Sequence, residues 1–275
     1  MNEISLLIPI YKRNLNYYES VSVHRTVKLF RNKADIILFG PESINTEDIN
    51  CEIKVDFSEV SKFIGFKSEF FESKKTYNSL LLNLDFYEKF RKYEYILIAQ
   101  ADSFIFGGGL KRWCREGFDY VGAPWWKDSQ NPNLGLWHVG NGGFSLRKVE
   151  SAIRVLESFD KLDLPFQIFD ACIESLDTFR MASRLLFLTK YMRKTGRCPR
   201  ENKFNEDRYW GIMASKIFPW YKVPDPFSAL EFSFEVHPKR MYKINNKNLP
   251  FGCHAWTKYG FDFWRHKIRC FGYDV

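Results

Sequence analysis

The chain has 275 residues, of which 45% are hydrophobic and 18% aromatic, and its formal net charge is +8. This apolar content is enough to bury a large core, so a disordered tail or a coiled coil is excluded as the main structure. The positive charge favours an anionic partner, which could be a nucleic acid, a phosphorylated small molecule or an acidic membrane surface. Charge alone does not choose among these.

The first residues and the cysteines indicate the compartment. Residues 1–9 lack a basic leader followed by a long apolar stretch, so they predict a first strand and not a signal peptide. No window approaches the ~18 apolar residues of a transmembrane helix. The cysteines are scattered without any C-x-x-C pair and are predicted to be reduced thiols; they are Cys51, Cys114, Cys172, Cys198, Cys253 and Cys270. We therefore expect a cytoplasmic protein.

The first hundred residues predict an alternation of strands and helices, which is typical of a Rossmann-like α/β sheet. Short apolar runs ended by proline, glycine or polar residues indicate strands, and apolar side chains at helical spacing indicate helices. The predicted elements are a strand over 3–10, a helix over 16–31, strands over 34–39 and 52–57, an amphipathic helix over 74–91, and a strand over 95–99 that is buried on both faces.

The pattern changes beyond residue 118. We expect strands and loops over 119–126 and 137–147, mostly helix over 150–200, and short helices with Pro-rich loops after that. Because no linker separates two parts, residues 1–275 are predicted to form one domain. We expect a nucleotide-binding half over 1–125 and an acceptor-side half over 126–275.

Asp102 follows the buried strand over 95–99. In open α/β sheets, ligands bind outside the carboxyl ends of the strands. A carboxylate there is well placed to coordinate a divalent cation that also binds phosphate oxygens. The alternative is that Asp102 caps a turn before Phe104.

A glycine-rich segment follows at 139–147, with Gly140, Gly142 and Gly143 around Asn141. Glycines let the backbone approach a ligand closely and adopt positive φ. The spacing is not that of a nucleotide triphosphatase loop. A tight turn between two strands is the alternative.

Glu206 and Asp207 form an acidic pair that opens a helical stretch after Asn205. One carboxylate could serve as the general base that takes a proton from an attacking hydroxyl. The alternative is structural, because Asn205 suits a helix N-cap and acids favour the first helical turn.

His254 lies in a loop-like segment, between Cys253 and Ala255. Neutral imidazole is a common metal ligand, although a histidine among aromatic residues can also be a core residue. A zinc site is not expected, because Cys253 is adjacent to His254 and no second pair has the required spacing.

Together these segments resemble the GT-A glycosyltransferases, and most closely a bacterial family of uncharacterised GT-A-like transferases. The resemblance implies a GT-A fold, with a mostly parallel, Rossmann-like central sheet flanked by helices, a helical insertion and a C-terminal acceptor-side portion. The motifs that carry it are Tyr-Asn-x-Leu-Leu at 77–81, Gln-x-Asp at 100–102, Gly-Ala-Pro-Trp at 122–125, Gly-Asn-Gly-Gly-Phe-Ser-Leu-Arg at 140–147, Asn-Glu-Asp at 205–207 and Pro-Phe-Gly-Cys-His-Ala-Trp at 250–256.

The resemblance also implies a function. It is the transfer of a sugar from a nucleotide-diphosphate donor to a hydroxyl of a glycan or lipid-linked acceptor, with inversion, in bacterial surface polysaccharide synthesis. Asp102 and His254 would hold Mn²⁺ or Mg²⁺, and Asp207 would be the catalytic base, with Glu206 as the alternative. The implied donor-binding residues are Pro9, Tyr11, Asn78, Gln100, Asp102, Trp125, Asn141, Gly142 and Gly143.

Gln100 departs from the usual Asp-x-Asp motif. Because glutamine supplies no anionic oxygen, the metal would be held by fewer charges, and metal independence stays open. A catalytically weak sugar-nucleotide-binding relative is therefore an alternative.

Two further features bear on substrates. Trp125, Trp126 and Trp137 could wall the sugar and exclude water, or fill the core. Residues 180–200 carry seven basic side chains and no acid. A basic amphipathic helix there would favour the inner-leaflet membrane surface and a peripheral location, or it would be an exposed basic face packed on the protein.

Two other classes of function fit the sequence less well. A nucleotidyltransferase would normally show a basic, glycine-rich signature near the first strand, and residues 11–14 contain no glycine. A nucleic-acid-binding protein would interleave basic and aromatic side chains, whereas here the aromatic residues fall mainly in apolar runs. We therefore expect no nucleic-acid partner.

Overall fold

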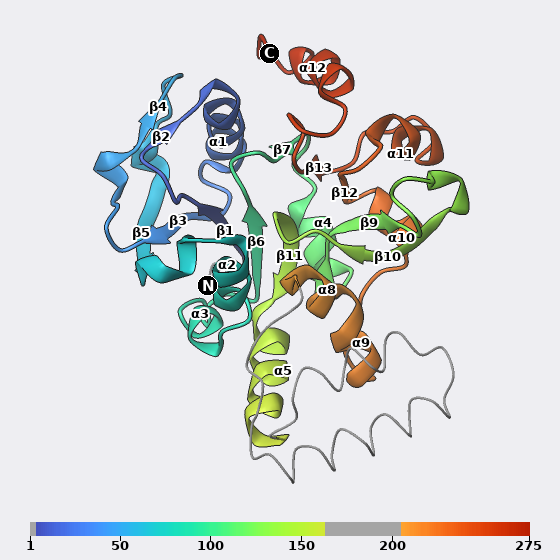
Figure 1. Ribbon diagram of the computed structural model, residues 1–275. Helices are drawn as coiled ribbons and strands as arrows, with labels where there is room; N and C mark the ends of the chain where they lie inside the picture. Colours follow the sequence, from blue (N-terminus) through green and yellow to red (C-terminus); the bar gives the residue numbers. More distant parts are fainter. Residues whose placement is uncertain (1–3, 163–204) are drawn as a thin grey trace.

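The computed structural model describes residues 4–162 and 205–275, and a six-stranded sheet lies at its centre (Figure 1). The strand order is β5-β3-β1-β6-β11-β8. The first four strands are parallel, and β11 runs antiparallel to both β6 and β8. The strands are β1 (Ile4–Pro9), β3 (Asp35–Pro41), β5 (Val60–Phe66), β6 (Tyr95–Ala99), β8 (Tyr120–Val121) and β11 (Phe144–Lys148). The protein is therefore a mixed α/β protein with a mostly parallel sheet, as predicted.

The central strands are continuously apolar, as is typical of strands whose two faces are both buried. Successive side chains point to opposite faces. Leu7 packs in one core with Phe86 and Trp210, whereas its neighbour Leu6 packs in the other core with Val27 and Trp113. Helices cover each face accordingly (Figure 1). The first core includes residues of α3 (Leu84–Glu88) and α5 (Val149–Leu162), and the second includes residues of α1 (Tyr17–Phe30) and α4 (Leu110–Arg115).

The predicted strands at 3–10, 34–39 and 95–99 and the helix at 16–31 are confirmed. The strand predicted over 52–57 is wrong. That segment alternates between exposed and half-buried side chains, but it pairs with no strand among the described residues, and the sheet continues at β5 instead. β5 is an edge strand with Ser61 and Lys62 exposed, so it lacks the apolar run that marks its neighbours.

The single helix predicted over 74–91 is also wrong, because two helices stand there, α2 (Lys74–Leu80) and α3. The break is made by Asn83, whose side-chain oxygen accepts a hydrogen bond from the Asp85 N–H at 2.8 Å. An asparagine that binds nearby backbone in this way competes with helix continuation and starts a new helix.

The C-terminal part adds small sheets and short helices beside the carboxyl ends of the parallel strands (Figure 1). β12 (Ser233–Phe234) pairs with β13 (Gly252–Cys253), which pairs with β7 (Phe104–Ile105). β9 (Ala123–Trp126) and β10 (Leu136–Gly140) form an antiparallel ribbon. The helices are α8 (Glu206–Arg208), the π-helix η5 (Tyr209–Met213), α9 (Ala214–Ile217), α10 (Pro226–Leu230), α11 (Pro238–Ile244) and α12 (Phe261–Arg269).

The remaining short elements lie in the connections. They are the paired strands β2 (Asn14–Leu15) and β4 (Asn50–Cys51) and the 3₁₀ turns η1 (Thr46–Asp48), η2 (Phe57–Glu59), η3 (Ser68–Phe71) and η4 (Pro132–Leu134). Of the expected reduced thiols, Cys51, Cys253 and Cys270 are free in the described part of the chain. Cys172, Cys198 and the basic segment 180–200 lie outside the described residues. Within 4–162 and 205–275, no helix combines the length and apolar character needed to span a membrane.

Candidate functional site

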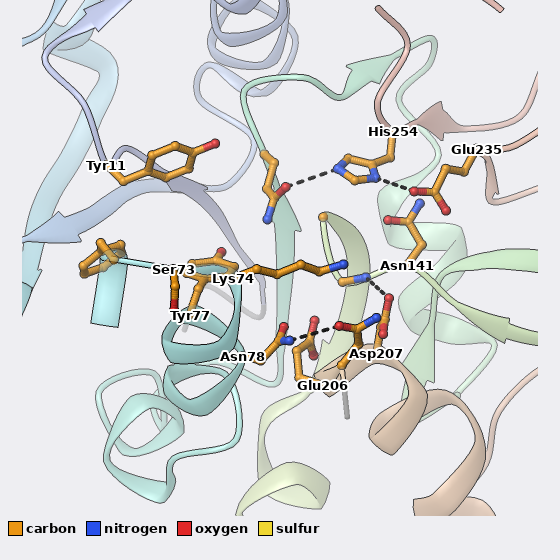
Figure 2. A pocket seen from close by; sticks show the side chains of 15 residues that line it. Tyr11, Ser73, Lys74, Tyr77, Asn78, Asn141, Glu206, Asp207, Glu235 and His254 are labelled. Atoms are coloured by element: carbon orange, nitrogen blue, oxygen red, sulfur yellow. Dashed lines mark hydrogen bonds and ion pairs between the residues drawn. The ribbon is translucent and has the colours of Figure 1, made fainter. Parts of the chain in front are cut away.

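A cavity of about 400 Å³ opens at the carboxyl edge of the parallel sheet, and we call it the carboxyl-edge pocket (Figure 2). Tyr11 reaches it from the segment after β1, and Gln100 from the segment after β6. The pocket is lined by Tyr11, Phe71, Ser73, Lys74, Tyr77, Asn78, Gln100, Asn141, Gly142, Gly143, Asn205, Glu206, Asp207, Glu235 and His254. Five separate segments of the motif pattern therefore meet in one cavity.

His254 is the centre of a polar cluster on one wall of this pocket. Its Nδ1 lies 3.1 Å from Glu235 Oε1 and its Nε2 lies 3.2 Å from Gln100 Oε1 (Figure 2). The same Nε2 lies 3.2 Å from Asp102 Oδ1. Burial alone would lower the pKa of His254, but Asp102 and Glu235 raise it to about 10. Burial would raise the pKa of Asp102, but the contact with His254 holds that pKa below its ordinary value.

The donor atoms of this cluster fit a hard divalent cation. In an octahedral site with bonds of about 2.1 Å, adjacent ligands lie about 3.0 Å apart, close to the separations from Nε2 to Asp102 and Gln100. Glu235 binds the opposite ring nitrogen, which is how an outer carboxylate orients a metal-binding histidine. Within the described ranges no three His, Cys, Asp or Glu side chains form a metal cluster, so the third donor would be the Gln100 amide oxygen.

Asp207 lies on another wall of the pocket, at the start of α8. Its Oδ1 accepts a hydrogen bond from the Arg208 N–H at 2.8 Å, and its Oδ2 lies 3.4 Å from the Gly142 N–H (Figure 2). Burial and the nearby charge of Glu235 raise the pKa of Asp207, and the two N–H groups oppose that shift. The carboxylate is thus held in place by backbone donors at the wall of the pocket.

Glu206 is turned away from solvent and is held by Arg147. The exposed fractions of the two side chains are 3% and 1%, and Arg147 Nη2 lies 2.9 Å from Glu206 Oε2. Arg147 also donates to Tyr87 Oη at 2.9 Å and to Ser145 Oγ at 3.1 Å. Burial raises the pKa of Glu206 to about 7, against the opposing charge of Arg147. This buried pair braces α8 against the strand that follows the glycine loop.

The glycine loop fits between these groups with little free space. A Cβ atom at Gly142 would lie 1.6 Å from Glu206 Oε1, and one at Gly143 would lie 2.1 Å from His254 Nε2. Asn141 adopts a left-handed φ of 73° and is 2% exposed, and its buried Nδ2 has no hydrogen-bond partner among the described residues. Strained backbone and unpaired polar groups of this kind concentrate at ligand sites.

Asn205 occupies the N-cap position of α8, but its side chain makes no capping hydrogen bond. Its Oδ1 instead accepts from Asn78 Nδ2 at 3.2 Å, across the pocket floor (Figure 2). Asn205 therefore has the predicted N-cap position but not the side-chain hydrogen bond of a cap. Both asparagines belong to the wall of the pocket.

The structure brings together most of the residues singled out from the sequence, but not all of them. Asp102 reaches the site through its contact with His254. Pro9 ends β1 without lining the pocket, and Trp125 lines a different cavity. Pocket residues that the sequence did not single out for the site are Phe71, Ser73, Lys74, Tyr77, Asn205 and Glu235. Of these, Lys74 extends into the pocket from the first turn of α2, and its charge opposes the rise in the pKa of Glu206 and of Asp207 (Figure 2).

Fold and site define an α/β protein with a polar, acid-rich pocket at the carboxyl edge of a mostly parallel sheet. The chain belongs to the family described as protein of unknown function (DUF5672), whose model matches residues 60–254. That family carries no stated activity, and no curated protein matches the sequence significantly.

Two solved structures resemble the chain at low similarity. One is a glycosyltransferase involved in the glycosylation of the major capsid of PBCV-1, with 11% identity and a TM-score of 0.44, covering 91% of this chain and 92% of that one. The other is the apo form of the glycosyltransferase GlyE of Streptococcus pneumoniae TIGR4, with 11% identity and a TM-score of 0.42, covering 91% of this chain and 54% of that one. Because both scores are low, the geometry of the pocket has to carry the functional interpretation.

Proposed function

We propose that this protein is a GT-A-type glycosyltransferase, which transfers a sugar from a nucleotide-diphosphate donor to a hydroxyl of a glycan or lipid-linked acceptor with inversion. One observation carries the proposal: His254, which contacts Asp102, and Asp207 line different walls of one pocket at the carboxyl edge of the sheet. That arrangement provides one place for a leaving diphosphate and another for a base. Bacterial surface polysaccharide synthesis, on the cytoplasmic face of a membrane, is the setting that the motif resemblance implies.

The donor would lie across the strand ends. The Tyr11 ring is 51% exposed at the pocket and offers a flat surface for a base or sugar. The unpaired Asn141 amide and the close-packed backbone of Gly142 and Gly143 would contact the sugar. Asn78 would close the floor.

Asp102 and His254 would hold Mn²⁺ or Mg²⁺, with the Gln100 amide as a neutral third donor. A cation bound there supplies charge that stabilises the departing diphosphate. Since His254 is protonated when it pairs with two carboxylates, metal binding would release its proton. Asp207 would take the proton of the acceptor hydroxyl as that oxygen attacks the anomeric carbon from the face opposite the diphosphate.

The donor assignment is tested by thermal unfolding with UDP-, GDP-, TDP- and CMP-sugars, each with and without Mn²⁺. A ligand present at 100 times its Kd should stabilise the protein by about 2.7 kcal/mol. If none of the donors raises the Tm, the donor site is wrong. If one raises the Tm equally with and without Mn²⁺, the metal assignment alone is wrong.

Asp102→Ala is expected to remove the Mn²⁺-dependent part of this stabilisation. The Asp102 side chain is 39% exposed, so its loss should leave the fold intact, whereas the cation would lose its anionic ligand. We expect at least about tenfold weaker Mn²⁺ binding in titration calorimetry, since even outer-shell changes cost that much. Asp274→Ala, at a side chain 93% exposed and far along the chain, is the control. Unchanged Mn²⁺ affinity in the Asp102 variant would exclude it as a ligand.

Gly143→Ala tests the position of His254 without touching its chemistry. The added methyl group would meet the imidazole at 2.1 Å and displace it, while the φ of Gly143 is not in the left-handed region. We expect the Mn²⁺-dependent donor shift to disappear. Gly108→Ala is the matched control, because nothing lies within 4 Å of the added atom. A normal donor shift in the Gly143 variant would mean that His254 is not needed where the structure places it.

A further inference from the structure

A second cavity, of about 370 Å³, lies along the β9–β10 ribbon. We call it the tryptophan cavity; its walls include Trp125, Trp126, Lys127, Asp128, Ser129 and Trp137. The proposed donor site does not account for these three indole rings, because none of them lines the carboxyl-edge pocket.

The tryptophan cavity and the carboxyl-edge pocket share a wall at two points. Glu235 lines the pocket, and the next residue, Val236, lines the tryptophan cavity. The Trp125 ring lies directly against Gly140, where an added Cβ would meet it at 2.1 Å, and the next residue, Asn141, lines the pocket. At these two points the two cavities are therefore separated by a single backbone segment.

The indole rings of this cavity have different roles. Trp126 is 6% exposed, and its Nε1 donates to the Val236 carbonyl at 2.8 Å, so it fixes the wall. Trp137 is 40% exposed and offers a ring face to a ligand. Large exposed rings of this kind are commonly binding groups.

The chemistry of the walls fits a saccharide. A sugar presents apolar C–H faces, which pack on aromatic rings, and a rim of hydroxyls, which hydrogen bond to polar groups. Lys127, Asp128 and Ser129 supply such groups beside the rings. Lys127 and Asp128 carry opposite charges, so the lining side chains of the cavity have no net charge.

We propose that the tryptophan cavity binds a sugar unit of the acceptor, so the acceptor is an extended glycan and not a single sugar or a simple alcohol. This rests on the proposed function. A glycan held on Trp137 would extend past the shared wall, and its acceptor hydroxyl would reach Asp207. Trp125, expected from its motif to contact the donor, then belongs to acceptor binding.

The test compares Trp137→Ala with Leu134→Ala on a glycan array of neutral and charged oligosaccharides. Leu134 is 54% exposed and lies in the β9–β10 connection, just before the strand that carries Trp137, but it does not line the cavity. We expect the wild type and the Leu134 variant to bind at least one class of oligosaccharide, and the Trp137 variant to bind it at least about tenfold more weakly. Both side chains are exposed, so the unfolding temperature should stay unchanged.

The outcomes separate this proposal from the proposed function. Absence of wild-type binding to any oligosaccharide, or equal binding by the Trp137 variant, would overturn it. The nucleotide-sugar thermal shift should be the same in all three proteins. If that shift is absent while glycan binding depends on Trp137, the transferase proposal fails and the saccharide site stands.

Discussion

Asp207→Asn is expected to reduce sugar transfer by about 10²–10⁴-fold, the range that a positioned general base contributes. Asparagine keeps the size of the side chain and one oxygen that can accept from the Arg208 N–H, so the wall of the pocket should persist. It cannot accept the proton of the attacking hydroxyl. Turnover is measured with the donor identified by thermal shift, whose stabilising effect should be retained.

The pH dependence of kcat tests the role of Asp207 in a second way. Burial and Glu235 raise the pKa of Asp207 above its ordinary value of 3.8, and a base works only when ionised. In the wild type, kcat should therefore fall on acidification at a higher pH than an ordinary aspartate would impose. Full turnover by the Asn variant would exclude Asp207. Glu206 is then the alternative, although Arg147 already binds it.

Arg147→Met is expected to lower the free energy of unfolding by about 3–5 kcal/mol, because it leaves Glu206 buried without its counter-charge. The same change removes hydrogen bonds to Tyr87 and Ser145. Urea denaturation gives the free energy directly. A loss below 1 kcal/mol would mean that the pair is not a buried brace.

The double variant Arg147→Met with Glu206→Gln is the control. It should be more stable than Arg147→Met alone, because no unpaired charge stays buried. The single variant should also depend on pH with a defined sign. The folded-state pKa of Glu206 is already raised to about 7 against an ordinary 4.5, and loss of Arg147 raises it further. Its stability should thus be greatest below about pH 4.5 and fall as the pH rises.

How far the sequence predicts this fold depends on burial. β1 and β6 are continuous apolar runs because both faces of each are covered, and such runs are visible in the sequence. β5 is covered less fully and carries Lys62, so its pattern resembles that of a loop. The break between α2 and α3 rests on one side-chain hydrogen bond from Asn83, which the helical spacing of the apolar residues conceals.

The candidate site divides in the same way. His254, Asp102 and Asp207 lie in short segments of unusual composition, and this composition predicts them as site residues. Arg147 was quoted within a motif but given no role, because arginine is almost never fully buried. A usable signal existed, since Arg147 and Ser145 share one side of a strand whose other side carries Phe144 and Leu146. Glu235 gave no signal because its partner lies 19 residues away.

The carboxyl-edge pocket also has a consequence for how the protein folds during its synthesis. Its contacts join Gln100 to His254 over 154 positions, and these two residues lie farther apart in the sequence than the paired strands β1 and β6. Such distant pairings form late, since the loops between them must close before any contact rewards them. During synthesis the parallel strands would emerge and fold first, and the pocket would be completed only when His254 had left the ribosome. A chain interrupted before that point would carry a sheet without a working site.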